Sequence, residues 1–88
     1  MAHESVQYPG MTLPAALLAR IKDTGINRQD LAELIGTSEE NISRWIKHGV
    51  RPGAQFTEKL CEFLQIDQDD LGALELRTEM EKWRRGPL

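Results

Sequence analysis

Residues 26–45 read INRQDLAELIGTSEENISRW, and apolar residues recur at helical spacing on both sides of a single glycine. Gly36 suits a tight turn between two helices, because glycine adopts a positive φ without steric cost and allows helices to approach closely. Asn27 and Ser38 stand where helix N-caps are expected. The expected buried positions of the two helices are Leu31, Leu34 and Ile35 in the first and Ile42, Trp45 and Ile46 in the second.

Three further helices are predicted outside this stretch. A first helix is expected between Thr12, an N-cap, and Gly25, a stop. A fourth follows Pro52, and a fifth begins after Asp67, another N-cap. Their apolar positions are Leu17, Leu18 and Ile21 in the first; Phe56, Leu60, Phe63 and Leu64 in the fourth; and Leu71, Leu74, Met80 and Trp83 in the fifth. No segment alternates with period two, so we expect an all-α chain of five helices.

Length and composition indicate a single globular domain. The chain has 88 residues, of which 40% are hydrophobic and 28% charged, values typical of a globular protein. It contains no long apolar run and no secretion signal, so we expect a cytoplasmic protein with no membrane partner. Cys61 is the single cysteine, which excludes an internal disulfide or a cysteine-built zinc site. We expect neither a bound metal nor another cofactor.

The order of residues within 26–45 resembles the Xre/Cro-like helix-turn-helix family of phage and bacterial repressors. The residues that match the family pattern in register are Leu31, Ala32, Gly36, Ser38, Ile42, Ser43 and Trp45. The resemblance covers about residues 14–71, including Pro52. It implies a compact five-helix, lambda-repressor-like domain that binds double-stranded DNA.

The resemblance also implies roles for individual residues. The helix from Ser38 to about His48 is expected to lie in the major groove of DNA, whose width admits an α-helix. The candidates for base contacts are Arg44, Ser43, Glu40 and Glu39. The candidates for phosphate contacts are Asn27 and Arg28 at the start of the preceding helix, together with Lys47, His48 and Arg51.

Two positions depart from the family pattern. Ile21 and Ile46 stand where many relatives pair an arginine with a glutamate, and an apolar pair can replace a buried ion pair without loss of stability. Glu39 and Glu40 occupy the reading end of the recognition helix. A carboxylate can accept a hydrogen bond from cytosine but repels phosphate. The alternative interpretation is that both acids favour the helix dipole.

The chain divides into three expected parts. Residues 1–11 show no period and are expected to form a flexible arm, residues 12–66 form the helix-turn-helix core, and residues 67–88 form a C-terminal helix. The net charge is −3, but the acidic excess lies mainly in residues 55–88, so the front half remains able to face DNA.

The C-terminal helix carries a second apolar stripe formed by Leu76, Met80 and Trp83. This stripe is a candidate dimerisation element, because two recognition helices about one DNA turn (~34 Å) apart read a two-fold symmetric operator. In the alternative interpretation, both stripes of this helix cap the small core.

The resulting hypothesis is a sequence-specific transcriptional regulator, a repressor that binds its operator as a homodimer. The alternative is a protein-interaction module on the same fold, such as an antitoxin subunit or an adaptor. Its support comes from the net acidity, Glu39 and Glu40, and the apolar tail, and a regulatory protein partner is compatible with both hypotheses. Because no nucleophile and base occur in a supporting context, we do not expect an enzyme.

Overall fold

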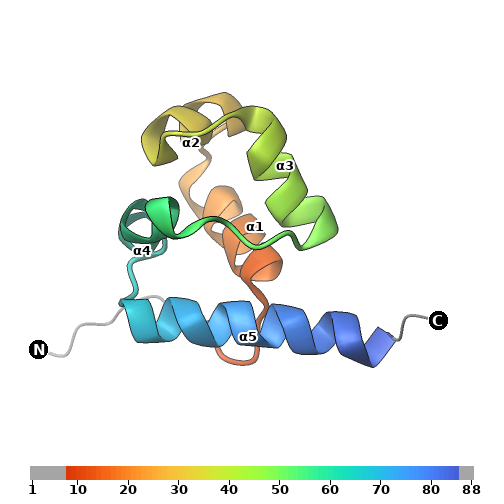
Figure 1. Ribbon diagram of the computed structural model, residues 1–88. Helices are drawn as coiled ribbons and strands as arrows, with labels where there is room; N and C mark the ends of the chain where they lie inside the picture. Colours follow the sequence, from red (N-terminus) through yellow and green to blue (C-terminus); the bar gives the residue numbers. More distant parts are fainter. Residues whose placement is uncertain (1–7, 86–88) are drawn as a thin grey trace, which may run out of the picture.

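The computed structural model describes residues 8–85, which form five α-helices and one short 3-10 helix (Figure 1). The helices are α1 (Leu13–Thr24), α2 (Arg28–Ile35), α3 (Glu39–His48), α4 (Thr57–Leu64) and α5 (Gln68–Arg85), with the 3-10 helix η1 (Ala54–Phe56) directly before α4. No strand occurs between residues 8 and 85, and the predicted all-α fold is confirmed. None of the helices in this range is long and apolar enough to cross a membrane.

The predicted helix ends are confirmed by capping contacts. Side-chain oxygens accept a hydrogen bond from a backbone N–H in the first turn of four helices, and they belong to Thr12, Asn27, Ser38 and Asp67. Gly36 ends α2 with a φ of 90°, in the left-handed region that favours glycine. Gly25 and Gly49 end α1 and α3 in the same region. Caps and glycines therefore position α2 and α3 on either side of the tight turn.

The core forms around α1, which contacts α3, α4 and α5, while α2 packs on α3 and α4. In Figure 1, α5 runs along one side of the molecule, and α2 and α3 lie on the opposite side of α1. Trp45 is buried, as the sequence predicts, and its ring centroid lies 5.3 Å from that of Phe56. The buried hydrophobic residues of the helices are Leu13, Ala16, Leu17, Leu31, Ala32, Ile35, Ile42, Trp45, Leu60, Phe63, Leu64, Leu71 and Leu74.

Two leucines of the predicted apolar faces are exposed. The prediction that Leu34 is buried is wrong, because its side chain is 47% exposed. The buried arc of α2 runs from Leu31 to Ala32, and at about 100° per residue Leu34 lies far from the centre of that arc. Leu18 is likewise exposed, because α1 buries its other side against the core.

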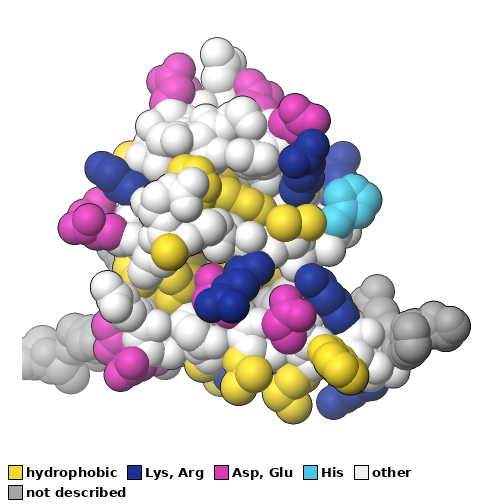
Figure 2. Space-filling model, in the orientation of Figure 1, with side chains coloured by type: hydrophobic (Ala, Val, Ile, Leu, Met, Phe, Trp, Pro, Cys, Tyr) yellow, Lys and Arg dark blue, Asp and Glu magenta, His cyan; other side chains and the backbone are white. Residues whose placement is uncertain are grey.

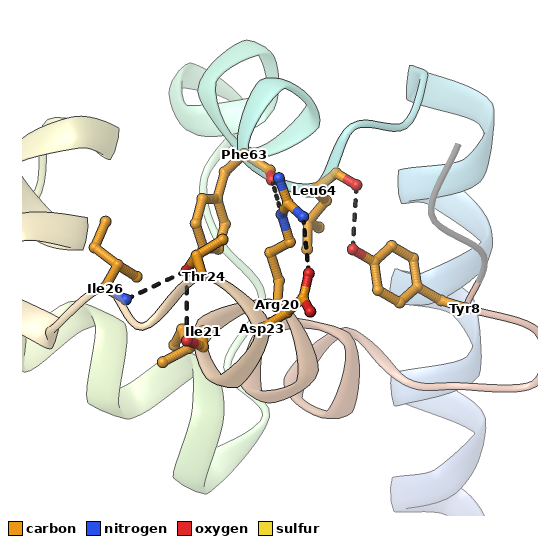
Figure 3. A network of polar contacts seen from close by, with 8 residues as sticks. All are labelled: Tyr8, Arg20, Ile21, Asp23, Thr24, Ile26, Phe63 and Leu64. Atoms are coloured by element: carbon orange, nitrogen blue, oxygen red, sulfur yellow. Dashed lines mark hydrogen bonds and ion pairs between the residues drawn. The ribbon is translucent and has the colours of Figure 1, made fainter. Parts of the chain in front are cut away.

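Residues 8–11 are anchored to the helices rather than free. Tyr8 is buried, and its hydroxyl donates to the carbonyl oxygen of Leu64 at 3.1 Å (Figure 3). Arg77 of α5 donates through Nε to the Met11 carbonyl at 2.6 Å and through Nη2 to the Tyr8 carbonyl at 3.3 Å. These residues therefore differ from the flexible arm expected for residues 1–11. Residues 1–7 and 86–88 lie outside the described part of the chain.

Buried polar contacts join α1 to α4 and α5. Arg20 donates through Nε to the carbonyl oxygen of Phe63 at 2.8 Å, and its guanidinium lies over the Phe63 ring (Figure 3). Thr78 of α5 accepts from the backbone N–H of Leu13 at 2.9 Å and donates to the Leu74 carbonyl at 2.8 Å. These contacts tie the start of α1 to α5 and its second half to α4.

Candidate DNA-binding surface

The surface of interest is formed by the exposed side of α3. Ile42 and Trp45 bury one side of this helix, and Ile46 is half-buried against the core. The turn before it is closed by the backbone N–H groups of Gly36 and Thr37, which both donate to the Ala32 carbonyl, at 2.8 and 2.9 Å. Since the inner side is buried and the entry turn is hydrogen-bonded, the outer side of α3 is presented to solvent on a fixed support.

The four candidates for base contacts lie within the first six residues of α3. Glu39, Glu40 and Arg44 are exposed, and Ser43 is half-buried. Arg44 Nη2 lies 3.3 Å from Glu40 Oε2, one turn away on the same helix. Both side chains are more than half exposed, so this pair contributes little to stability. The guanidinium of Arg44 is therefore available to a ligand, in competition with the Glu40 carboxylate.

Glu39 and Glu40 are the first two residues of α3, directly after the Ser38 cap. Acidic side chains in a first turn interact favourably with the positive end of the helix dipole. Their position is thus the one that the helix-dipole interpretation requires, and the Glu40 carboxylate also pairs with Arg44.

The cationic candidates for phosphate contacts flank the exposed side of α3. Lys47 and His48 form its exposed last turn, and Arg51 follows in the loop before η1. Arg51 Nη2 lies 3.3 Å from Glu75 Oε1, and that carboxylate side chain is only 14% exposed. Figure 2 shows lysine and arginine side chains together with a histidine on the part of the surface that α3 forms.

Asn27 and Arg28 stand at the other helix of the motif. The Asn27 Oδ1 atom is used as the N-cap of α2, where it accepts from the Asp30 N–H at 2.7 Å. Arg28 is the first residue of α2 and is half-buried. The structure thus places the expected phosphate contacts at the start of α2 and at the end of α3.

Sequence reasoning missed one cation near the end of α3. Lys82 of α5 lies against Gly49, the C-cap of α3, and shares a surface groove with Lys47 and His48. Lys82 is more than thirty positions from Lys47, His48 and Gly49 along the chain, so only tertiary packing brings it to them.

The three dimerisation candidates lie on α5, and all of them are exposed. Leu76 is 61% exposed, Met80 55% and Trp83 80%. The interpretation in which this stripe caps the core is therefore wrong. The buried side of α5 is formed by Leu71, Leu74 and Thr78 instead.

The described residues offer little for metal or thiol chemistry. Between residues 8 and 85, no group of three or more His, Cys, Asp or Glu side chains is arranged to hold a metal ion. Partial burial raises the pKa of the Cys61 thiol, and the carboxylates of Asp67, Glu75 and Asp70 raise it further. A thiol with a raised pKa is a poor nucleophile at neutral pH.

Comparison with known proteins agrees with this geometry. The family model of the Cro/C1-type helix-turn-helix DNA-binding domain matches residues 16–75. The solution structure of the DNA-binding domain of the P22 C2 repressor (residues 1–76) is similar to this chain, with a TM-score of 0.61 and 25% sequence identity. The similarity covers 73% of this chain and 84% of that one. Among curated proteins, none matches the sequence significantly. The chain belongs to the family of Cro/C1-type helix-turn-helix DNA-binding domains.

Proposed function

We propose that this DNA-binding regulator is a sequence-specific repressor that binds a two-fold symmetric operator as a homodimer. The observation that carries the proposal is the exposed side of α3, where Arg44, Lys47 and His48 lie on a helix that buries Ile42 and Trp45 on its inner side. A helix of this kind fits the major groove, the one groove that distinguishes all four base pairs.

In the proposed complex, base contacts and phosphate contacts come from different residues. Arg44 reads guanine by a bidentate pair of hydrogen bonds, because a guanidinium presents two parallel donors to the guanine O6 and N7 atoms. Ser43, one position before it, contacts a neighbouring base edge. Lys47, His48 and Arg51 at the end of α3, with Arg28 at the start of α2, contact phosphates and set the register. Repression follows when the bound protein occludes a promoter.

Dimerisation is supported by the exposed stripe of Leu76, Met80 and Trp83 on α5. Large apolar side chains that are contiguous and exposed usually have a partner. A second copy of the chain supplies the second recognition helix, so that two weak half-site contacts act together as one strong interaction.

Selection from a randomised DNA duplex pool tests this function. We expect enrichment of a symmetric sequence, with an affinity that falls steeply as the salt concentration rises. Arg44→Ala should cost roughly 1–3 kcal/mol and relax the preference at one base position. Lys47→Ala is the matched variant, and it should weaken binding to all sequences about equally. An equal loss for every sequence with Arg44→Ala would refute the base-reading role of this residue.

A second candidate is a protein-interaction module on the same fold. It is favoured by the 80% exposure of Trp83 and by the two carboxylates, Glu39 and Glu40, at the reading end of α3. If the selection enriches nothing and the protein binds no duplex even at low salt, this candidate replaces the first one.

A further inference from the structure

The C-terminal half of α5 packs against the end of the recognition helix. A Cβ atom built on Gly49, the C-cap of α3, would lie 3.2 Å from Lys82 Cε and 3.5 Å from Thr78 Cγ2. Thr78 and Lys82 are one turn apart on α5, so the same side of α5 faces Gly49 over two successive turns. The Lys82 side chain therefore approaches the C-cap of α3, and Lys82 lines a groove together with Lys47 and His48 of the last turn of that helix.

A surface groove opens at this point between three helices. Its walls are the last turn of α3, the first turn of α1 and the C-terminal half of α5, and the lining residues include Lys47, His48, Glu81 and Lys82. Two ammonium groups and an imidazole lie here with the carboxylates of Glu81 and of Glu79, which pairs with Lys82. Lys47 and Lys82 are exposed, so an approaching anion can reach both ammonium groups.

Lys82 is not held by a strong partner. Its Nζ lies 3.4 Å from Glu79 Oε2, and the two side chains are 44% and 43% exposed. An exposed ion pair of this kind is worth little in water, so the ammonium group can exchange this carboxylate for another anion. Arg51, on the same loop as Gly49, is instead tied to the largely buried Glu75.

We propose that Lys82 contacts a DNA phosphate, and that the DNA-binding surface therefore extends from α3 onto the C-terminal half of α5. The inference rests on the proposed DNA binding, since the phosphate belongs to the same duplex that α3 reads. Lys82 lies beyond residues 16–75, so the part of the chain that the family model covers does not include this contact. The partner is the duplex backbone, because lysine side chains of DNA-binding proteins commonly donate to its phosphate oxygens.

The test compares Lys82→Gln with Lys59→Gln. Lys59 is an exposed lysine of α4 that does not line the groove. Both variants therefore lose one positive charge, but only Lys82→Gln loses it at the groove. Binding is measured to the selected operator and to an unrelated duplex at several salt concentrations. We expect Lys82→Gln to weaken both complexes several-fold and to reduce the slope of log K against log salt by about one for each lost contact, which is about two for the proposed dimer. Lys59→Gln should leave the slope unchanged.

Glu79→Gln provides the reciprocal variant. Removing the carboxylate that competes for Lys82 should raise the affinity for both duplexes, and this gain should vanish when Lys82→Gln is added. If Lys82 acts only by stabilising the negative end of the α3 dipole, Lys82→Gln lowers the melting temperature, but the salt slope stays equal to that of the wild type. That result, or equal behaviour of the Lys82 and Lys59 variants, would overturn the inference while DNA binding itself stands. Failure of the wild type to bind any duplex would overturn the proposed function instead.

Discussion

Arg44 and Glu40 lie one turn apart on the exposed side of α3, with 3.3 Å between Nη2 and Oε2. A guanidinium has five N–H donors, so Arg44 can donate two of them to a guanine while Glu40 competes for the others. In the proposed complex, the Glu40 carboxylate also lies close to the negative duplex. At the scale of one residue, we therefore expect Glu40 to lower the affinity that Arg44 provides.

Glu40→Gln tests this competition. We expect the variant to bind all duplexes several-fold more tightly, because a like-charge repulsion and a competing acceptor are both removed. The measurement is the affinity for the operator and for an unrelated duplex at fixed salt. Glu39→Gln is the matched control, because Glu39 lies in the same first turn of α3 but forms no ion pair with Arg44. A loss of preference at one cytosine with Glu40→Gln would show instead that Glu40 reads a base.

Tyr8 is a second residue for which we expect an effect, in this case on the pH dependence of stability. Burial raises the pKa of its hydroxyl above the usual value of 10.0, and Asp23 adds to this, while Arg20 acts in the opposite direction. The neutral hydroxyl donates to the Leu64 carbonyl in the folded protein. Because the pKa is higher in the folded state than in the unfolded one, the contribution to stability is complete below about pH 10. It is lost as the pH rises through the folded pKa.

Tyr8→Phe should therefore lower the free energy of unfolding by about 1 kcal/mol at pH 7. The difference between the two proteins should shrink above pH 10, where the wild-type hydroxyl ionises. Urea unfolding at pH 7, 9 and 11 measures this difference, and effects of lysine ionisation are common to both proteins. A difference that stays constant up to pH 11 would contradict the assignment.

At the scale of elements, α1 and α5 are joined by one buried hydroxyl. Thr78 accepts from the first N–H group of α1 and donates within α5 to the Leu74 carbonyl. The side chain is 8% exposed, so water cannot replace either bond freely. The same residue contacts the position of Gly49, and the start of α1, the end of α3 and the middle of α5 therefore meet at Thr78.

Thr78→Val keeps the shape of the side chain and removes both hydrogen bonds. We expect it to lower the free energy of unfolding by about 1–3 kcal/mol, since the buried N–H of Leu13 loses its acceptor. Thr24→Val is the matched control, because the Thr24 hydroxyl makes only exposed local contacts. Chemical denaturation compares the two variants, and an equal, small effect of both would disprove the role given to Thr78.

At the scale of the whole molecule, the apolar stripe of α5 lies on the same turns that hold the end of α3. Leu76 and Met80 are exposed, while Glu75, Thr78 and Lys82 contact or face the region around Gly49 and Arg51. At about 100° per residue, Leu76 and Met80 lie on the opposite side of α5 from Thr78, so a dimer formed through the stripe would have α5 between the partner and the end of α3.

Leu76→Glu is expected to prevent dimerisation, because it places a carboxylate within the stripe. Sedimentation equilibrium should give the mass of a monomer, and the affinity for a two-fold operator should fall far more than the affinity for a half-site. Leu34→Glu is the control, since Leu34 is an exposed leucine of α2, away from the stripe. An unchanged mass for the Leu76 variant, or a monomeric wild type, would rule out this dimer.

Helix existence, helix type and helix ends were predictable from local sequence. Asn27 and Ser38 cap α2 and α3, and Gly36 ends α2, as predicted, because these contacts form within a few residues. The all-α fold follows from the periodicity of the apolar residues, and the family from the ordered residues between Leu31 and Trp45. The roles of the individual DNA-contact residues remain predictions.

Local sequence did not predict which apolar residues are buried at the edges of each face, or which distant residues meet. Leu34 has the hydrophobicity of a core residue, but the neighbouring helices cover the arc of α2 that holds Leu31, Ala32 and Ile35 and leave Leu34 exposed. Tyr8 is anchored by groups from α4 and α5, and Lys82 reaches Gly49 across more than thirty residues of chain. Capping and periodicity act over one or two turns, whereas these contacts depend on how the helices cross. Only the packed arrangement of α1, α3 and α5 could decide them.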